Sequence, residues 1–226
     1  LRAVAQGYAE SPVSEHVTVP RMAYISFPSE SGTVYSLAEL EALRAVCDEF
    51  GMYLFVDGAR LAYGLAASGN DVMLPDIARL SDAFYIGGTK CGALFGEAMV
   101  VVTPVLQPYF RNSMKQAGTM LAKGWLLGLQ FTELFEGGRY FEIGKVAVTQ
   151  AMRIKAALAK RGLLAEPDSP TNQQFALMND AQFAALGEAC VAEFEGKTVE
   201  GLNMVRLCTS WSTADAEVDA VVAAIG

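Results

Sequence analysis

The sequence has 226 residues, of which 52% are hydrophobic and 19% are charged, and its formal net charge is −8 at pH 7. A chain of this length and apolar content can bury one large core or two smaller ones. The negative charge excludes nucleic acid or an anionic membrane as the main partner, because both are bound by clustered Lys and Arg. No apolar stretch is long enough to cross a bilayer, so we expect no membrane partner.

The four cysteines lie far apart in the chain, at Cys47, Cys91, Cys190 and Cys208. They have neither the CxxC spacing of a zinc site nor the density of a disulfide framework. We therefore expect reduced thiols, a cytoplasmic protein and no bound metal. The chain begins at Leu1, without the basic and apolar segments of a secretion signal, and we expect it to be a piece of a longer polypeptide.

The first fifty residues contain one strong helix signal. Residues 1–20 hold two prolines and are expected to form a connecting segment, and the apolar run at 22–27 predicts a strand. Residues 36–39 read Ser-Leu-Ala-Glu, a pattern in which the Ser and Glu side chains satisfy free amides at the start of a helix. Apolar residues continue at helical spacing until Gly51 ends the helix.

Three short apolar runs predict further strands, at residues 53–56, 83–86 and 98–102. Helical stretches separate these runs. This alternation is typical of a mostly parallel sheet that is covered on both faces. The first half of the chain is therefore expected to form part of an α/β layer fold.

The second half of the chain begins with a long amphipathic helix and then alternates again. We expect helices at 120–136 and 139–161, a strand at 174–178, a helix at 181–194, a strand at 204–208 and a last helix opened by Ser212-x-x-Asp215. The sequence thus predicts a large domain at residues 1–137 and a smaller α+β domain at residues 138–226, with the long helix as the bridge.

Two polar residues follow predicted strands, where open α/β sheets bind their ligands. Asp57 follows the run at 53–56, and Lys90 follows the run at 83–86 after two glycines. Glycines let a ligand approach the backbone, and a carboxylate can hold the protonated pyridine nitrogen of a cofactor. On spacing alone, a plain turn at Asp57 and a solvated Lys90 are favoured over a cofactor site.

Sequence motifs at residues 55–61, 82–90, 92–97 and 205–207 reverse that balance. They read Phe-Val-Asp-Gly-Ala-Arg-Leu, Asp-Ala-Phe-Tyr-Ile-Gly-Gly-Thr-Lys, Gly-Ala-Leu-Phe-Gly-Glu and Val-Arg-Leu. Together they resemble the low-specificity threonine aldolases, within the β-eliminating lyase group of aspartate-aminotransferase-fold enzymes. The likeness extends from Tyr24 to the C terminus. It implies part of a three-layer large domain like that of the pyridoxal-phosphate transferases, followed by a small α+β domain.

The resemblance also implies a role for individual residues. Lys90 is expected to form a Schiff base with pyridoxal 5'-phosphate, and Asp57 to pair with the pyridine nitrogen. Thr89 is expected to hydrogen-bond near the phosphate or the ring, and Arg60 to lie near the cofactor and the substrate carboxylate. Arg206 matches the arginine that receives the α-carboxylate, a role that suits a planar guanidinium.

The implied activity is that of a pyridoxal-phosphate-dependent carbon–carbon lyase. It would cleave L-threonine or a related β-hydroxy-α-amino acid to glycine and an aldehyde, and it would act as a homodimer or homotetramer. Two alternatives remain open. The first is a β-eliminating amino-acid lyase, and the second is an inactive fragment that acts only as a dimerising scaffold.

The sequence departs from the family before its first strand. Family members carry an earlier segment with a Gly-Thr phosphate cup and a histidine that stacks on the cofactor, and His16 does not match that histidine. Lys115 and Lys123 are either phosphate contacts or the solvated face of a helix. Cys91 is next to Lys90, but no histidine base lies near it in sequence, so we assign it no nucleophilic role.

Overall fold

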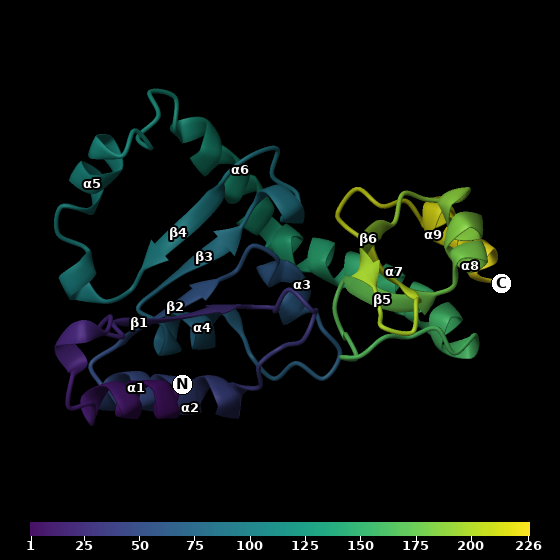
Figure 1. Cartoon of the computed structure of the whole chain (residues 1–226). Helices are drawn as coiled ribbons and strands as arrows, with labels where there is room; N and C mark the ends of the chain where they lie inside the picture. The colour runs from purple at the N-terminus through teal and green to yellow at the C-terminus, as the bar shows by residue number, and fades with distance from the viewer.

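The computed structural model describes residues 1–226 and contains two β-sheets linked by a long helix (Figure 1). The first sheet has the order β1-β2-β3-β4, with β1 at Met22–Ser26, β2 at Tyr53–Asp57, β3 at Ala83–Gly87 and β4 at Glu97–Val101. The first three strands are parallel, and β4 runs antiparallel to β3. The predicted α/β fold with a mostly parallel sheet is therefore confirmed.

Helices cover one face of this sheet. They are α1 at Arg2–Ala9, α2 at Leu37–Glu49 and α4 at Leu74–Leu80, which lie on the same side in Figure 1. The strand side chains buried on that face are Ala23, Leu54, Val56, Phe84 and Ile86. The opposite face presents Tyr24, Phe55 and Tyr85, one from each parallel strand, and Tyr24 is 54% exposed. This face of the sheet is therefore less covered than the first.

The helix predicted after the first strand is confirmed in detail. The Ser36 hydroxyl accepts the Glu39 amide at 3.3 Å, and the Glu39 carboxylate accepts the Ser36 amide at 2.8 Å. The Ser36 amide and the Ser36 hydroxyl, which also donates to the Glu39 carboxylate at 2.9 Å, lower the pKa of Glu39, with the amide as the largest cause. The reciprocal pair satisfies two backbone donors that the first turn of a helix leaves free.

The expectation of a connecting segment at residues 1–20 is wrong for its first half. Helix α1 occupies Arg2–Ala9 and a 3-10 turn follows at Ser14–His16. Ala5 is buried against the first sheet and Arg2 pairs with Glu49 of α2 at 2.6 Å. The helix has no side-chain cap, so the sequence lacks the usual signal of its start.

The segment after β4 is helical. It contains a 3-10 turn at Pro104–Leu106, α5 at Phe110–Gln116, α6 at Trp125–Phe135, a second 3-10 turn at Glu136–Gly138 and the long α7 at Arg139–Lys160. Helix α7 crosses the short helix α3, Leu61–Leu65, so closely that a Cβ on Gly144 would lie 2.3 Å from the Ala62 carbonyl oxygen. Its first half packs into the core of the first sheet, and Ile154 and Leu158 pack into a second core. The predicted boundary at residues 137 and 138 stays a prediction.

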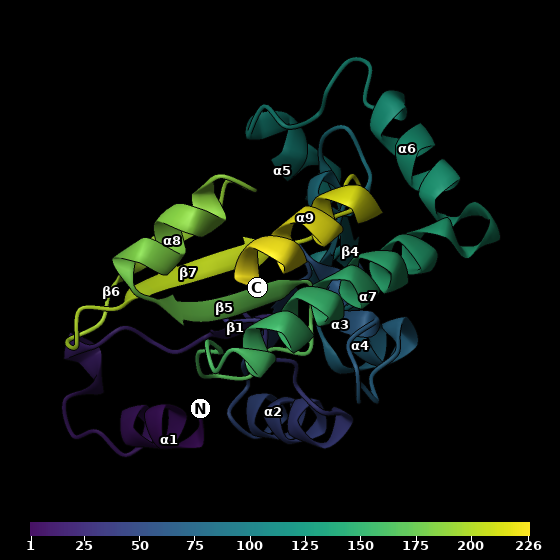
Figure 2. The same ribbon diagram turned by 90° about the vertical axis from the view of Figure 1, so that its right-hand side faces the viewer.

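The second sheet has the order β5-β7-β6 and is antiparallel throughout. Its strands are β5 at Gln173–Met178, β6 at Glu193–Lys197 and β7 at Asn203–Cys208, with α8 at Asp180–Gly187 and α9 at Asp215–Ile225. The helix expected at 181–194 is wrong in its second half, because α8 ends at Gly187 and β6 begins at Glu193. Figure 2 shows α7, α8 and α9 beside this sheet.

None of the helices combines the length and the apolar character that crossing a bilayer requires.

Candidate functional site

Lys90 lies in a short 3-10 turn, Thr89–Cys91, directly after β3. The turn is fixed from two sides. The Gly88 amide donates to the Glu97 carboxylate at 2.6 Å, and the Tyr63 hydroxyl donates to the Lys90 carbonyl oxygen. The Lys90 side chain is exposed and no ion pair or hydrogen bond engages its amine. Its backbone is therefore held while its amine remains free to react.

Glycines bring the Lys90 turn against the turn that follows β2. A Cβ on Gly87 would lie 2.2 Å from the Ala59 carbonyl oxygen, and a Cβ on Gly58 would lie 2.1 Å from the Tyr85 carbonyl oxygen. Real Cβ atoms do not come this close to backbone oxygen, so neither glycine can be replaced without movement of the backbone. The two strand ends are thus in direct backbone contact, which joins the Lys90 turn to Arg60.

Asp57 ends β2, and both of its carboxylate oxygens have partners. Oδ1 accepts the Ala59 amide at 2.9 Å, and Oδ2 accepts the Tyr24 hydroxyl. The hydrogen bond to Asp57 is the largest cause that raises the pKa of Tyr24 to about 12. The Tyr24 ring stacks on Phe55 with ring centroids 5.4 Å apart. The aspartate is therefore oriented on the less covered face of the sheet.

A pocket of about 290 Å³ brings three of the predicted residues together. Arg60, Thr89 and Lys90 line it from the first sheet, with Tyr63 beside them. The opposite wall comes from the residue before β5, the end of β7 and the segment after β7, through Asn172, Cys208, Thr209, Ser210 and Trp211. Asp57 and Arg206 do not line it. The pocket is formed between the two sheets, so its shape depends on how they pack together.

Arg60 is largely buried, with a side chain that is 13% exposed, and its ion pair uses only one nitrogen. Nη1 lies 3.2 and 3.1 Å from the two carboxylate oxygens of Glu30. Neither Nη2 nor Nε takes part in a hydrogen bond or an ion pair with the protein. Because Arg60 also lines the pocket, these donors are available to a ligand there.

Arg206 has a different environment. Its guanidinium pairs with Glu193, lies 2.9 Å from a Glu195 oxygen through Nε, and donates to Gln173 at 3.4 Å. The Nε contact to Glu195 lacks hydrogen-bond geometry, and Nε has no hydrogen-bond partner. Burial lowers the pKa of Arg206, but the two carboxylates and Cys208 outweigh it and the net pKa is raised. All three nitrogens are thus directed at protein groups.

Sequence reasoning missed several residues of the site. Glu97 stands in a quoted motif, but its contact with the Gly88 amide depends on the antiparallel return of β4. Partial burial of its carboxyl group is the largest cause that raises the pKa of Glu97. The Gly88 amide and the Lys90 charge oppose this rise, and the Asp57 charge adds to it. Trp211 carried no signal, because its place in the pocket depends on the second sheet.

The remaining candidates lie elsewhere or are inert. Lys115 and Lys123 are exposed near α5 and do not line the pocket. Cys91 is fully buried, and burial raises the pKa of its thiol to about 11, so the thiol is neutral near pH 7. No group of three or more His, Cys, Asp or Glu side chains is arranged to hold a metal ion.

The donor set of this region fits pyridoxal phosphate. A free amine at Lys90, unpaired guanidinium donors at Arg60 and the Thr89 hydroxyl line one pocket. Asp57 lies outside the lining, but the Ala59 amide orients its carboxylate at the end of β2, the strand that neighbours β3. A carbonyl, a phosphate and a pyridine nitrogen can each find a suitable partner among these groups.

The chain is similar to known proteins over most of its length. The family model described as "Beta-eliminating lyase" matches residues 5–185. A low specificity L-threonine aldolase from a Pseudomonas species is 28% identical over 216 residues, which is 93% of this chain and 60% of that protein. One from Pseudomonas aeruginosa is 35% identical over 108 residues, covering 48% of this chain and 31% of that one.

A solved structure of Leishmania major threonine aldolase gives a TM-score of 0.94 at 40% identity. The match covers 98% of this chain and 65% of that one. The chain therefore spans a little under two thirds of the length of the Pseudomonas sp. and Leishmania major proteins.

Proposed function

The chain belongs to the β-eliminating lyase family, and we propose that it forms part of a pyridoxal-phosphate-dependent carbon–carbon lyase. The substrate is L-threonine or a related β-hydroxy-α-amino acid, and the products are glycine and an aldehyde. The observation that carries this proposal is the free Lys90 amine in one pocket with the unpaired donors of Arg60. The threonine aldolases that the chain resembles support the choice of substrate.

Each residue has a definite part in the proposed reaction. Pyridoxal phosphate, when bound, supplies an electron sink for the carbon that loses its bond. Lys90 holds the cofactor through its amine, and Thr89 donates its hydroxyl proton near the phosphate or the ring. Asp57 keeps a proton on the pyridine nitrogen, and its orientation by the Ala59 amide supports this role.

Substrate binding falls to the arginines and the pocket wall. Arg60 binds the α-carboxylate through Nη2 and Nε, and Arg206 is a second candidate for the same group. The segment after β7, including Trp211, forms the wall of the pocket on the other side of the bound substrate. As the Cα–Cβ bond breaks, the β-hydroxyl gives its proton to water and becomes the aldehyde carbonyl. The electron pair left on Cα then takes up a proton, which gives glycine.

Borohydride reduction tests the assignment of Lys90. The protein is incubated with pyridoxal phosphate, reduced and mapped by peptide mass. We expect one stoichiometric adduct on Lys90, absent from Lys90→Ala and retained in Lys123→Ala, which serves as the matched control. An adduct spread over surface lysines, or none, would reject the proposal for this chain.

The rival lyase activity is separated by its product. A β-eliminating lyase removes the β-hydroxyl group and releases ammonia and a 2-oxo acid, which is pyruvate from serine and 2-oxobutyrate from threonine. The proposed reaction instead gives glycine and an aldehyde. Both products can be assayed with L-threonine, L-allo-threonine and L-serine. A 2-oxo acid in excess of glycine from all three substrates would favour β-elimination.

An exposed apolar surface on α6 supports a homo-oligomer. Trp125, Leu126 and Leu129 are 64%, 41% and 58% exposed, and Leu94 and Phe95 lie close by. Exposed apolar patches of this kind mark interfaces. We propose a homodimer or homotetramer of a cytoplasmic enzyme, in keeping with the four free cysteines. Light scattering gives the molar mass of wild type and of Trp125→Glu, and we expect the variant to have the lower mass. The alternative function, an inactive scaffold, predicts a dimer that does not bind the cofactor.

A further inference from the structure

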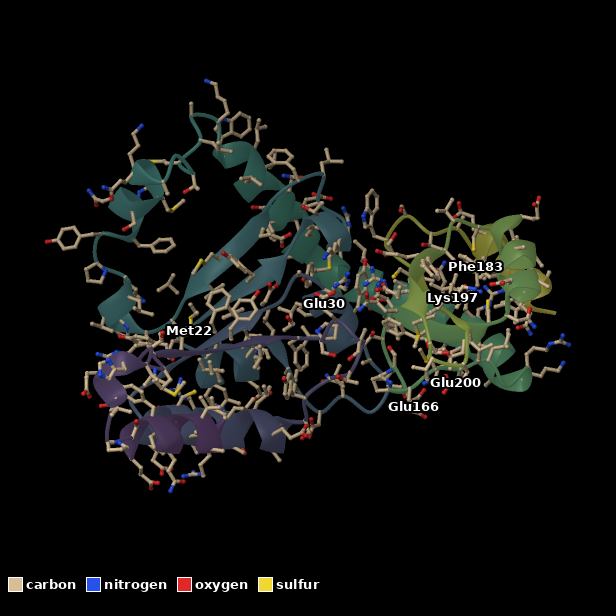
Figure 3. The ribbon with its side chains drawn as sticks, in the orientation of Figure 1. Met22, Glu30, Glu166, Phe183, Lys197 and Glu200 are labelled. Atoms are coloured by element: carbon tan, nitrogen blue, oxygen red, sulfur yellow. The ribbon has the colours of Figure 1, made fainter.

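We propose that Glu30 is a positioning residue that turns Arg60 toward a ligand carboxylate, and so restricts the substrate to amino acids with a free α-carboxylate. This inference rests on the proposed function, because it concerns the same pocket. Glu30 follows β1, and Figure 3 shows it at the end of the first sheet that faces the second. Its carboxylate is the only protein group that pairs with Arg60.

The geometry of the pair leaves Arg60 able to bind a second anion. Both Glu30 oxygens approach Nη1, at 3.1 and 3.2 Å, instead of forming two parallel bonds to two nitrogens. A carboxylate that takes the two-nitrogen edge of a guanidinium uses up its strongest binding geometry. Glu30 leaves the Nη2 and Nε donors of Arg60 unpaired, so it orients the group without occupying it.

The Glu30 backbone is fixed by the second sheet. The Gln173 side chain, which is fully buried on β5, donates to the Glu30 carbonyl oxygen at 3.2 Å. Next to it, Gly32 has φ +79°, and a Cβ there would lie 2.2 Å from the Ser169 hydroxyl oxygen. The loop therefore packs closely against β5 and the segment before it, and the Glu30 side chain, which is 70% exposed, reaches Arg60.

Glu30 thus links Arg60, which lines the pocket, to the second sheet. Its backbone carbonyl accepts a hydrogen bond from Gln173 of the second sheet, and its carboxylate pairs with Arg60 in the turn after β2. When the two sheets are packed together, Arg60 is held with its free donors available in the pocket. A ligand without a carboxylate gains nothing from this arrangement, so the effect of Glu30 is specific to carboxylate ligands.

A binding experiment with two ligands tests this role. Protein equilibrated with pyridoxal phosphate is titrated by calorimetry with glycine and with methylamine, which has the amine but no carboxylate. Loss of Glu30 is expected to weaken glycine binding about tenfold in Glu30→Ala and about threefold in Glu30→Gln, which keeps an acceptor oxygen. Methylamine binding stays unchanged. Glu200→Gln, the same charge change on an exposed residue without a side-chain contact, leaves both affinities unchanged.

A second measurement does not depend on the cofactor. The side-chain Nε–H resonance of Arg60, assigned with Arg60→Lys, is recorded by nitrogen-15 NMR in protein without pyridoxal phosphate. Glu30 is expected to keep this resonance narrow, and Glu30→Ala is expected to broaden it. An unchanged resonance would overturn the proposal.

The outcomes separate the two proposals. If wild type binds glycine no more tightly than methylamine, the carboxylate site of the proposed function is wrong. If wild type discriminates and Glu30→Ala discriminates equally well, the role of Glu30 is wrong. An equal loss of both ligands in Glu30→Ala also overturns it, because that result indicates a general disturbance of the pocket.

Discussion

The surroundings of Arg60 and Arg206 differ, although both side chains are largely buried, at 13% and 15% exposure. Arg60 begins the short helix α3 at the end of a strand, and one carboxylate holds one of its nitrogens. Arg206 lies within β7, where β6 directs Glu193 and Glu195 at it and β5 adds an amide. The first arginine keeps donors for a ligand, and the second directs its donors at neighbouring strands.

The difference follows from where the two residues lie in their sheets. A side chain within a strand faces cross-strand neighbours on both sides, so its hydrogen bonds are satisfied inside the sheet. A residue in a turn beyond the strand end has fewer neighbours and faces the crevice in which α/β folds bind ligands. Resemblance assigns a substrate carboxylate to both arginines. We propose Arg60 for that contact, because it keeps unpaired donors, and Arg206 remains the second candidate.

The largest expected effect is a loss of stability in the turns that hold Arg60. It tests whether their backbone contact is rigid, as the strand pairing around Arg206 is. In Gly87→Ala the new Cβ would meet the Ala59 carbonyl oxygen at 2.2 Å, and backbone cannot yield as a side chain tip can. We expect a loss of about 3 kcal/mol or more in the free energy of unfolding, measured by urea denaturation.

A matched glycine supplies the control. Gly128 lies in α6 with no atom within 4 Å of an added Cβ, so Gly128→Ala is expected to be neutral or to stabilise the helix by up to about 1 kcal/mol. If the two variants had equal stability, the close approach of the two strand ends would not be a constraint, and Arg60 would lie on a flexible turn.

The next effect compares the two arginines directly. Met keeps the apolar stem and removes the charge, so Arg206→Met leaves two neighbouring carboxylates without their cation. We expect a cost of about 1–2 kcal/mol in the free energy of unfolding, moderated because Glu193 and Glu195 can turn toward water. Arg60→Met breaks one pair with the exposed Glu30 and is expected to cost less than about 1 kcal/mol.

Glycine binding is expected to rank the same variants in the opposite order. Arg60→Met removes the donors in the pocket and weakens glycine binding more than Arg206→Met does. Thermal unfolding and calorimetric titration of both variants provide the two rankings. If the same variant showed the larger loss in both stability and glycine binding, the distinction between a binding arginine and a structural arginine would be wrong.

Much of the first sheet and its polar strand ends could be predicted from the sequence. Local signals were sufficient to predict α2, because Ser36 and Glu39 form the capping box at its start. They were also sufficient to predict β2, which ends at Asp57, and β3, which precedes Lys90. The family match confirms the resemblance drawn from four short segments. These features depend on residues close together in the chain, so their patterns are visible without the fold.

The missed features depend on contacts between distant parts of the chain. Strand β6 reads Glu-Phe-Glu-Gly-Lys and lies mostly exposed at a sheet edge, so it shows no buried alternation, and its pairing with β7 alone defines it. The pair of Glu30 with Arg60 joins residues thirty positions apart. The wall of the pocket around Trp211 requires the second sheet to pack against the first, which no local pattern specifies.

The smallest expected effect concerns Asp57, whose carboxylate is held by a neutral hydroxyl and an amide, whereas Glu193 is held by a guanidinium. The pKa of Tyr24 is raised from 10.0 to about 12 because its hydroxyl donates to Asp57. Folding therefore favours the neutral phenol: its contribution to stability is complete below pH 10 and is lost as the pH rises through about 12. In an absorbance titration of phenolate, Tyr24→Phe is expected to remove one ionisation near pH 12. Tyr109→Phe, which removes an exposed hydroxyl without a partner, should leave that ionisation intact. Equal titration curves for wild type and Tyr24→Phe in that range would show that Tyr24 does not hold Asp57.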